Sequence, residues 1–252
     1  MIRFGRYKIG GGIMTTLLMR FRGVITDVDG TLIDSERGKM HAHRLTVEHF
    51  GGVWHDRLYL QFLGQSGLEV SAGIVRAAQL DCLPTEYREE YLQVKRAMSG
   101  KPLIHPWVPN LLRGFAEYTA LPIAFVSSGY TTIELKTLIA DLLYDADVSP
   151  KGRVILCGSD DPRVPEGRKT AHGIRQIVRD LGLDTATDLC LGLEDSLEGL
   201  RVLEAADIGT IIFVEHFANR GLPLSDDWIS MRKRYVIPAT GSWGELRRKL
   251  RI

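Results

Sequence analysis

Two aspartates separated by a single residue give the first chemical signal in the sequence. The stretch GVITDVDGTLIDSE, residues 23–36, places Asp27 and Asp29 at the end of an apolar run that is typical of a buried strand. Residues two apart on an extended backbone point to the same side, so both carboxylates can face one pocket, and Gly30 then permits a sharp turn. Two negative charges so close are costly unless a cation or a shared proton compensates them. An ordinary aspartate-rich turn is the alternative interpretation.

Further polar residues lie where such a pocket would need them. Ser127 and Ser128 follow the apolar run PIAFV, Glu194 and Asp195 follow LCLGL, and Lys169 precedes a helical pattern. Each has an ordinary interpretation when taken alone: a helix N-cap for the serines, acids of a first helical turn, and a surface lysine. Ligands of open α/β sheets bind beyond the carboxyl ends of the strands. The signals together therefore predict one shared site.

The elements that must position these residues are strands and helices in alternation. Strands are predicted at GVIT, PIAFV, RVILC, LCLGL and IGTIIFV, and helices within 131–143, 171–182 and 196–207. This order predicts an α/β fold, a Rossmann-like parallel sheet with helices on both faces. Mostly helical stretches without a convincing strand, between about 36 and 105, predict an inserted α-helical cap domain. The predicted division is an N-terminal extension over 1–22, an α/β core over 23–36 and 106–252, and the cap over 37–105.

Composition excludes several classes of protein. The chain has 252 residues with 44% hydrophobic residues, and its 32 Lys and Arg against 31 Asp and Glu leave a formal charge of +1. No net field favours nucleic acid or an anionic membrane as a partner, and no apolar run has the ~20 residues of a spanning helix. Three cysteines far apart in sequence, Cys82, Cys157 and Cys190, argue against a disulfide scaffold or a zinc site. We expect a soluble cytoplasmic protein, a monomer or homodimer, although a basic, acid-free start can also be a transit sequence.

Two long segments carry a resemblance to a known family. DVDGTLIDS resembles the first motif of the haloacid dehalogenase (HAD) superfamily of phosphohydrolases. GLEDSLEGLRVLEAADIG resembles the fourth motif, in the form seen in β-phosphoglucomutase-like and phosphoglycolate-phosphatase-like members. The resemblance covers about residues 24–215 and implies a Rossmann-like core with a helical C1 cap, a phosphoryl-transfer activity and Mg²⁺ as cofactor.

The resemblance also implies roles by position. Asp27 matches the nucleophile that forms an aspartyl-phosphate, and Asp29 matches the general acid/base, which also offers Mg²⁺ a backbone carbonyl. Ser127 matches the hydroxyl that binds a phosphoryl oxygen, and Lys169 matches the lysine of the third motif. The predicted metal ligands are Asp27, Asp29, Glu194 and Asp195, and the predicted substrate-binding residues are Gly30, Thr31, Ser128, Gly129 and Lys39.

Some positions depart from the family pattern. The third motif reads RKTAH without the usual proline, which makes Arg168 and Lys151 rivals of Lys169; the spacing of 25 residues to Glu194 favours Lys169. Gly67 stands where the mutases carry an arginine for a second substrate phosphate, which favours a phosphatase.

The polar residues of the first cap helix are the candidates for setting specificity. Lys39 stands where the mutases carry a histidine, and His41, His43 and Arg44 share the same helix. A solvated polar face is the favoured interpretation of these four residues, with contact to the substrate as the alternative.

These residues together predict a Mg²⁺-dependent phosphatase. It would hydrolyse a small phosphorylated metabolite, a sugar phosphate or a phosphoglycolate-like ester, through an aspartyl-phosphate intermediate. The alternatives are a β-phosphoglucomutase-like sugar-phosphate mutase and a catalytically idle scaffold. Mg²⁺ suits the site because it prefers carboxylate and carbonyl oxygens, and because phosphoryl transfer depends mainly on positioning and charge stabilisation.

Overall fold

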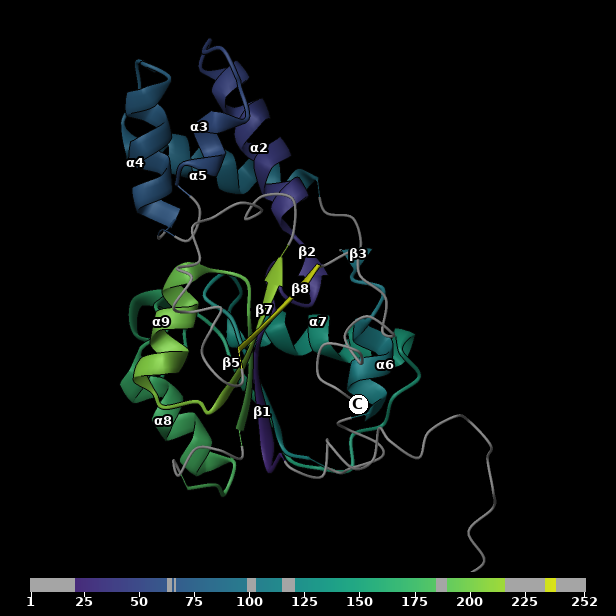
Figure 1. Cartoon of the computed structure of the whole chain (residues 1–252). Helices are drawn as coiled ribbons and strands as arrows, with labels where there is room; N and C mark the ends of the chain where they lie inside the picture. The colour runs from purple at the N-terminus through teal and green to yellow at the C-terminus, as the bar shows by residue number, and fades with distance from the viewer. Residues whose placement is uncertain are drawn as a thin grey trace, which may run out of the picture.

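A parallel sheet of six strands forms the centre of the described chain (Figure 1). The structure is a computed structural model that describes residues 21–62, 65, 67–98, 103–114, 121–184 and 190–215, and the backbone of 234–238. The strand order is β5-β4-β1-β6-β7-β8, and all neighbouring pairs are parallel. The strands are β1 (Gly23–Asp27), β4 (Ile123–Val126), β5 (Val154–Cys157), β6 (Cys190–Glu194), β7 (Thr210–Glu215) and β8 (Arg234–Pro238).

Two helical layers cover the two faces of the sheet. Because side chains alternate along a strand, Val24 faces one layer and Ile25 the other. The first layer holds α6 (Val108–Leu112) and α7 (Thr132–Asp145), and the second holds α8 (Ala171–Asp180) and α9 (Leu197–Ala205) (Figure 1). A short 3₁₀ turn, η2 (Pro165–Gly167), precedes α8. The predicted Rossmann-like fold is confirmed, and the five predicted strands are β1, β4, β5, β6 and β7.

Four helices form a separate group beyond the carboxyl end of the sheet, which we call the cap (Figure 1). They are α2 (Glu36–His49), α3 (Arg57–Leu60), α4 (Gly67–Ala77) and α5 (Pro84–Ala97). Their buried apolar residues make a core of their own, in which Ile74 and Tyr87 are fully buried. α5 packs against both α2 and α4. The boundaries predicted for the cap, 37 and 105, stay a prediction.

A two-stranded antiparallel ribbon joins the cap to the sheet. It consists of β2 (Ile33–Asp34) and β3 (Leu103–Ile104), the segments at which the chain enters and leaves the cap. No strand was predicted between 36 and 105, and β3 shows that this prediction was wrong at residues 103–104. A strand of two residues is too short to produce a periodic signal. β8 was also not predicted.

Two expectations from composition are tested by the described residues. Cys82, Cys157 and Cys190 are all free thiols. Among the helices that the structure describes, none combines the length and apolar character needed to cross a bilayer. The basic segment 1–20 lies outside the described residues.

Strand β4 provides a test of the sheet core. Phe125 of β4 is fully buried in the core shared with α6 and α7, so Phe125→Ala removes a large side chain and leaves a cavity. We expect a loss of about 3–5 kcal/mol in the free energy of unfolding, measured by urea denaturation. Ile133→Ala is the control, because Ile133 is 77% exposed on α7 and its loss is expected to cost less than about 0.5 kcal/mol. Equal losses in the two variants would contradict the assigned core.

Candidate active site

Three neighbouring strands end at one edge of the sheet and bring the predicted site residues together. Asp27 is the last residue of β1, Ser127 follows β4, and Asp195 follows β6. β1 lies between β4 and β6, with Asp27 paired to Val126 in register. The parallel order therefore places the predicted residues side by side, as expected for the carboxyl ends of an open sheet.

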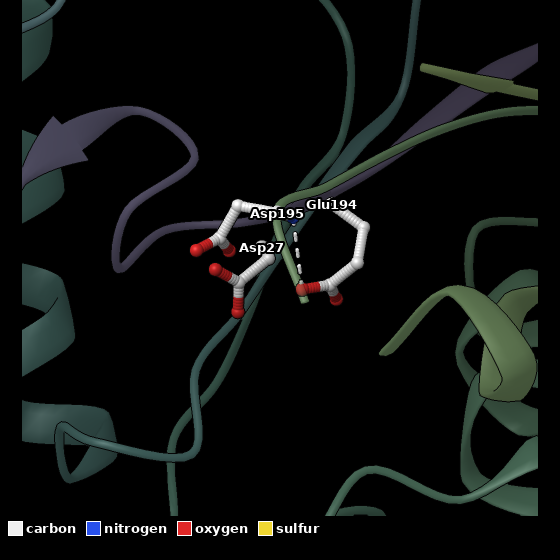
Figure 2. A group of neighbouring side chains, drawn as sticks. All are labelled: Asp27, Glu194 and Asp195. Atoms are coloured by element: carbon white, nitrogen blue, oxygen red, sulfur yellow. Dashed lines mark hydrogen bonds between the residues drawn. The ribbon is translucent and has the colours of Figure 1, made fainter. Parts of the chain in front are cut away.

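Asp27, Glu194 and Asp195 form a compact group of buried carboxylates (Figure 2). One oxygen from each lies within 4.8 Å of the others. The carboxylates of Asp27 and Asp195 point toward one another, whereas that of Glu194 turns to the side, over its own backbone (Figure 2). Oxygen atoms converging in this way are the donors that hard divalent cations prefer. The carboxylate of Asp29 is not a member of this group.

Lys169 supplies the cation that faces this group. Its Nζ donates to Asp27 Oδ1 at 2.8 Å and to Glu194 Oε2 at 2.5 Å. Arg168, the rival candidate, is more than half exposed and donates to Glu69 at the start of α4, at 3.3 Å. The structure thus brings Lys169 into the cluster and leaves Arg168 at the boundary between cap and core. Lys151 is exposed.

Glu194 is held by the beginning of α9. Its Oε1 accepts hydrogen bonds from the backbone N–H groups of Asp195 and Ser196, at 3.1 Å each, and from the Ser196 hydroxyl at 2.9 Å. A Cβ at Gly199 would lie 2.0 Å from Glu194 Oε2, so only glycine leaves room for this carboxylate. The alternative interpretation of this acid as a first-turn residue is wrong, because Glu194 ends β6 and lies two residues before Ser196, the N-cap of α9.

Asp29 makes a separate set of contacts. Ser127 Oγ donates to Asp29 Oδ2 at 3.0 Å and itself accepts the N–H groups of Gly129 and Tyr130. A Cβ at Gly129 would lie 2.9 Å from the same Asp29 oxygen, which explains the glycine. Ser127 thus orders the turn and holds Asp29 in this structure, and its predicted contact with a phosphoryl oxygen stays a prediction. Ser128 is exposed beside it.

Lys39 links the cap to Asp29. Its Nζ lies 3.3 Å from Asp29 Oδ1 and 2.6 Å from Oε1 of Glu36. The other Glu36 oxygen accepts the Tyr59 hydroxyl at 2.6 Å. Glu36 is buried, and sequence reasoning did not single it out. The buried glutamate and tyrosine together fix the ammonium of Lys39 beside the core.

The loop after β1 is built from contacts that the sequence did not reveal. Gly30 has a φ of 78°, where glycine is favoured, and its N–H donates to the Ile33 carbonyl at 2.9 Å. Thr31 is fully buried and donates to Asp195 Oδ1 at 2.9 Å. His105 Nε2 lies 3.0 Å from the Gly30 carbonyl. Gly30 and Thr31 therefore shape the loop and orient Asp195, and their predicted contacts with a substrate stay predictions.

The first cap helix corrects the expectation of a solvated polar face. His41 and Arg44 are exposed, but His43 is buried. The His43 ring stacks on Tyr91 with centroids 4.0 Å apart, and Nδ1 lies 3.0 Å from the Tyr87 hydroxyl. Burial lowers the pKa of His43 to about 3, so the ring is neutral. Lys39 is also partly buried and faces the site. The polar residue types of α2 alone did not show that α5 packs on this side of the helix.

Two cations on α5 were missed: Lys95, which approaches the site, and Arg88, which lies beside the start of α4. Lys95 Nζ lies 5.4 Å from the ring centroid of Tyr130, the residue that closes the Ser127 turn. The guanidinium of Arg88 fills the space beside Gly67. A helix was predicted here, and positions 88, 91 and 95 lie on one face of it. This spacing is the signal from which Arg88 and Lys95 could have been identified.

The carboxylates of the site fall into two electrostatic classes. Burial raises the pKa of Asp27 well above its ordinary value, against the attraction of Lys169, and the neighbouring carboxylates raise it further. The pKa of Asp195 is raised by burial and by Glu194. Burial also acts to raise the pKa of Asp29, but the charges of Lys39 and Lys95 outweigh it and hold this pKa below its ordinary value. The pKa of Lys169 is raised, because Asp27 and Glu194 outweigh its burial.

The residues of the cluster fit a divalent cation. Within the described residues, Lys169 forms ion pairs with two of these three buried carboxylates, Asp27 and Glu194. Burial is the largest cause of the raised pKa values of Asp27 and Asp195, and the neighbouring carboxylates raise them further. Asp27 and Asp195 point toward one another, and Glu194 lies beside them. A hard cation such as Mg²⁺ would complete this set of oxygens.

Comparison with known proteins places this site in context. No protein-family model matches the chain. The chain is 28% identical over 184 residues to the bifunctional riboflavin kinase/FMN phosphatase of Arabidopsis thaliana, covering 73% of this chain but only 46% of that protein. Its fold is similar to that of CbbY from Rhodobacter sphaeroides, solved with phosphate (TM-score 0.63, 19% identity, 87% of this chain and 95% of that one). It is also similar to a haloacid dehalogenase-like family hydrolase from Streptococcus pneumoniae (TM-score 0.59, 17% identity, 88% and 96%).

The uncompensated charge predicts a specific pH dependence of stability. The folded pKa of Asp195 is raised, so the folded state holds more protons than the unfolded state, and stability falls as the pH rises above the ordinary aspartate pKa. In chelator at pH 7, we expect Asp195→Asn to raise the free energy of unfolding by roughly 1–3 kcal/mol and to flatten its decline between pH 4 and 7. Urea denaturation across this pH range measures both effects. Asp81→Asn, at an exposed cap aspartate, is the control, and a destabilised Asp195→Asn protein at pH 7 would contradict the electrostatic account.

Proposed function

The chain belongs to the haloacid dehalogenase-like hydrolases by its fold, its motifs and its distant sequence similarity, and on that premise we propose that it is a phosphatase of small phosphorylated compounds. The observation that carries the proposal is the position of Lys169, whose ammonium bridges Asp27 and Glu194 at the carboxyl edge of the sheet. A buried carboxylate beside a lysine, in an acidic cluster suited to Mg²⁺, is an arrangement for attack on a phosphate ester.

Asp27 acts as the nucleophile in the proposed reaction. One of its carboxylate oxygens attacks phosphorus, the bond from phosphorus to the ester oxygen breaks, and an aspartyl-phosphate forms. The leaving alkoxide takes its proton from the carboxyl group of Asp29 in its acid form. Lys169, 2.8 Å from Asp27, stabilises the negative charge on the phosphoryl oxygens. Asp27 and Asp195, with Glu194 beside them, would hold Mg²⁺. The bound ion would favour the ionised carboxylates and offset their repulsion of an anionic substrate.

Asp29 then serves the second half of the reaction as a base. After it has given up its proton, its lowered pKa favours the carboxylate form, which accepts a proton from the water that attacks the aspartyl-phosphate and so returns to the acid form. The bond from phosphorus to Asp27 then breaks, releasing inorganic phosphate and restoring the free carboxylate. The Ser127 hydroxyl, 3.0 Å from Asp29 Oδ2, orients this base.

The names of similar proteins support the coarse substrate class. The plant relative is named for an FMN phosphatase, and the bacterial CbbY structure holds phosphate. Small metabolites that carry a phosphate monoester are the substrates proposed to reach the buried cluster. A sugar phosphate or a phosphoglycolate-like ester fits within this class, and the sugar-phosphate mutase is the alternative reaction on the same residues.

The nucleophile is tested by removing its charge. Asp27→Asn keeps the shape of the side chain but removes the attacking oxygen anion, so we expect phosphate release to fall by about 10³-fold or more across a panel of phosphate esters with Mg²⁺. Asp34→Asn is the matched control, because Asp34 lies on β2 and pairs with Arg37 outside the cluster. Retained activity in Asp27→Asn would remove Asp27 from the nucleophile role. Incubation with a hexose 1-phosphate separates the mutase, which would yield the 6-phosphate, from the phosphatase, which yields free phosphate.

Substitutions at two adjacent positions test whether Lys169 or Arg168 is the cation that acts beside Asp27. Lys169→Met removes the ammonium that faces Asp27, and we expect kcat to fall by about 10²–10³-fold. Arg168→Met removes an equal charge from a side chain that is 54% exposed and points to Glu69, and we expect an effect of less than about threefold. Steady-state kinetics on the best ester of the panel measure both. The assignment fails when Arg168→Met shows the larger loss.

A further inference from the structure

A buried histidine, His105, lies where the chain leaves the cap and meets the loop after β1. It directly follows β3, whose Ile104 pairs with Ile33 of β2. The backbone N–H of His105 donates to the Leu32 carbonyl at 3.0 Å, so the antiparallel pairing continues by one residue toward the site. Only 6% of His105 is exposed. The sequence motifs and the reaction at Asp27 leave this buried imidazole without a role.

The side chain of His105 holds a backbone carbonyl of the loop. Its Nε2 lies 3.0 Å from the Gly30 carbonyl oxygen. Because a carbonyl oxygen can only accept a hydrogen bond, Nε2 carries the proton and donates it. The imidazole stacks on the ring of Trp107, with centroids 6.4 Å apart and planes inclined by 14°, and Trp107 belongs to the same apolar core as Val28 and Leu32. Packing thus fixes the ring in the orientation that reaches Gly30.

The carbonyl that His105 binds belongs to the peptide between Gly30 and Thr31, which joins two parts of the site. A peptide group is planar, so fixing its oxygen also fixes the direction in which the chain enters Thr31. Thr31 is fully buried, and its hydroxyl donates to Asp195 Oδ1 at 2.9 Å. On the other side of this peptide, Gly30 directly follows Asp29. Movement of this one peptide would therefore displace both Asp29 and the donor to Asp195.

The contact with His105 differs from the hydrogen bonds that close the loop on itself. The N–H of Gly30 donates to the Ile33 carbonyl at 2.9 Å, and the N–H groups of Leu32 and Ile33 donate to the Val28 carbonyl at 2.9 and 3.2 Å. These bonds join residues at most five positions apart and set the shape of the loop. His105 is 75 residues from Gly30, so its contact sets the position of the loop against the segment that leaves the cap.

We propose that His105 is a positioning residue for the phosphatase reaction. By holding the peptide between Gly30 and Thr31, it keeps Asp29 and the hydrogen bond from Thr31 to Asp195 in the geometry that the reaction requires. The proposal rests on the proposed phosphatase function and adds a residue that acts through the loop. A displacement of about 1 Å in a catalytic group can cost about 100-fold in rate, so one buried hydrogen bond at this point affects kcat strongly.

Two substitutions separate the N–H group of His105 from its ring. His105→Phe keeps an aromatic ring beside Trp107 but removes the donor to the buried Gly30 carbonyl. His105→Gln removes the ring but can place an amide N–H near the position of Nε2. With the best ester of the panel and Mg²⁺, we expect His105→Phe to lower kcat about 10- to 100-fold and to change KM less than about threefold. His105→Gln is expected to restore kcat to within about fivefold of the unmodified chain.

A double-mutant cycle tests whether His105 acts through Thr31. Thr31→Val keeps the shape of the side chain and removes the hydroxyl that donates to Asp195. If this hydrogen bond depends on His105, part of the loss in kcat is shared, and we expect the combined loss to be at least about fivefold smaller than the product of the single losses.

Arg113→Met is the matched control for the loss of a side-chain donor to a backbone carbonyl. Arg113 Nη2 donates to the Ala146 carbonyl at 2.8 Å, at the end of α7 remote from the Ser127 turn. We expect this variant to keep kcat within about twofold of the unmodified chain, because independent sites do not couple.

Hydrogen exchange in chelator, without substrate, tests the hold on the loop independently of turnover. We expect the amides of Gly30, Leu32 and Ile33 to exchange at least about tenfold faster in His105→Phe, because the loop opens more often when its distant contact is lost. Their exchange in His105→Gln and in Arg113→Met is expected to stay near that of the unmodified chain. Urea denaturation of each variant shows that it is folded under the conditions of both measurements.

The possible results are distinct. A loss of kcat in His105→Gln or Arg113→Met as large as in His105→Phe would overturn the positioning role, as would single losses that simply multiply in the cycle. Unchanged exchange in His105→Phe would overturn it as well. Failure of the phosphatase function would appear separately, as no phosphate release by the unmodified chain above the Asp27→Asn background. In that case the exchange rates alone decide whether His105 holds the loop.

Discussion

The ammonium of Lys169 and the carboxylates of Asp27 and Glu194 form the interaction on which the site depends. The two contacts, 2.8 Å and 2.5 Å long, are largely shielded from solvent, and Asp195 adds a further negative charge nearby. One cation cannot balance three buried carboxylates, so the fold must place donors around them. It does so with Ser196, the N-cap residue of α9, for Glu194 and with the Thr31 hydroxyl for Asp195. The residual deficit of positive charge is what suits the cluster to a divalent ion and a phosphate ester.

The sequence was sufficient to predict this convergence because it depends on simple periodicities. Apolar runs of four to seven residues, each ending at a polar or glycine-containing turn, predicted five of the strands, and the parallel order brings their carboxyl ends together. These patterns alone predicted that Asp27, Ser127 and Asp195 lie at the same edge of the sheet. The choice between Arg168 and Lys169 depended on a shift of one residue in an irregular segment, and there only the spacing to Glu194 favoured the lysine that the structure places in the cluster.

Other features depend on packing between distant segments, and the sequence could not predict them. His43 was expected on a solvated face, but α5 covers it and stacks Tyr91 on its ring. The roles of Glu36 and Tyr59 in holding Lys39 arise from a contact across 23 residues. Arg88 is an ordinary helix residue until α4 places Gly67 beside it. The residue type at each position was known from the sequence, but the neighbouring residues in the fold, which determine its role, were not.

The ion pair between Lys39 and Asp29 spans the division between the cap and the sheet. Among the described residues, the cap also meets the core through this contact of 3.3 Å, through Lys95 over the Tyr130 ring and through the exposed pair of Arg168 and Glu69, besides the narrow ribbon of β2 and β3. An exposed pair contributes at most about 1 kcal/mol, so the more shielded pair of Lys39 and Asp29 is the stronger of the two ion pairs. An anionic ligand that reached Lys39 would compete with Asp29 for the same ammonium and so weaken this contact between cap and core.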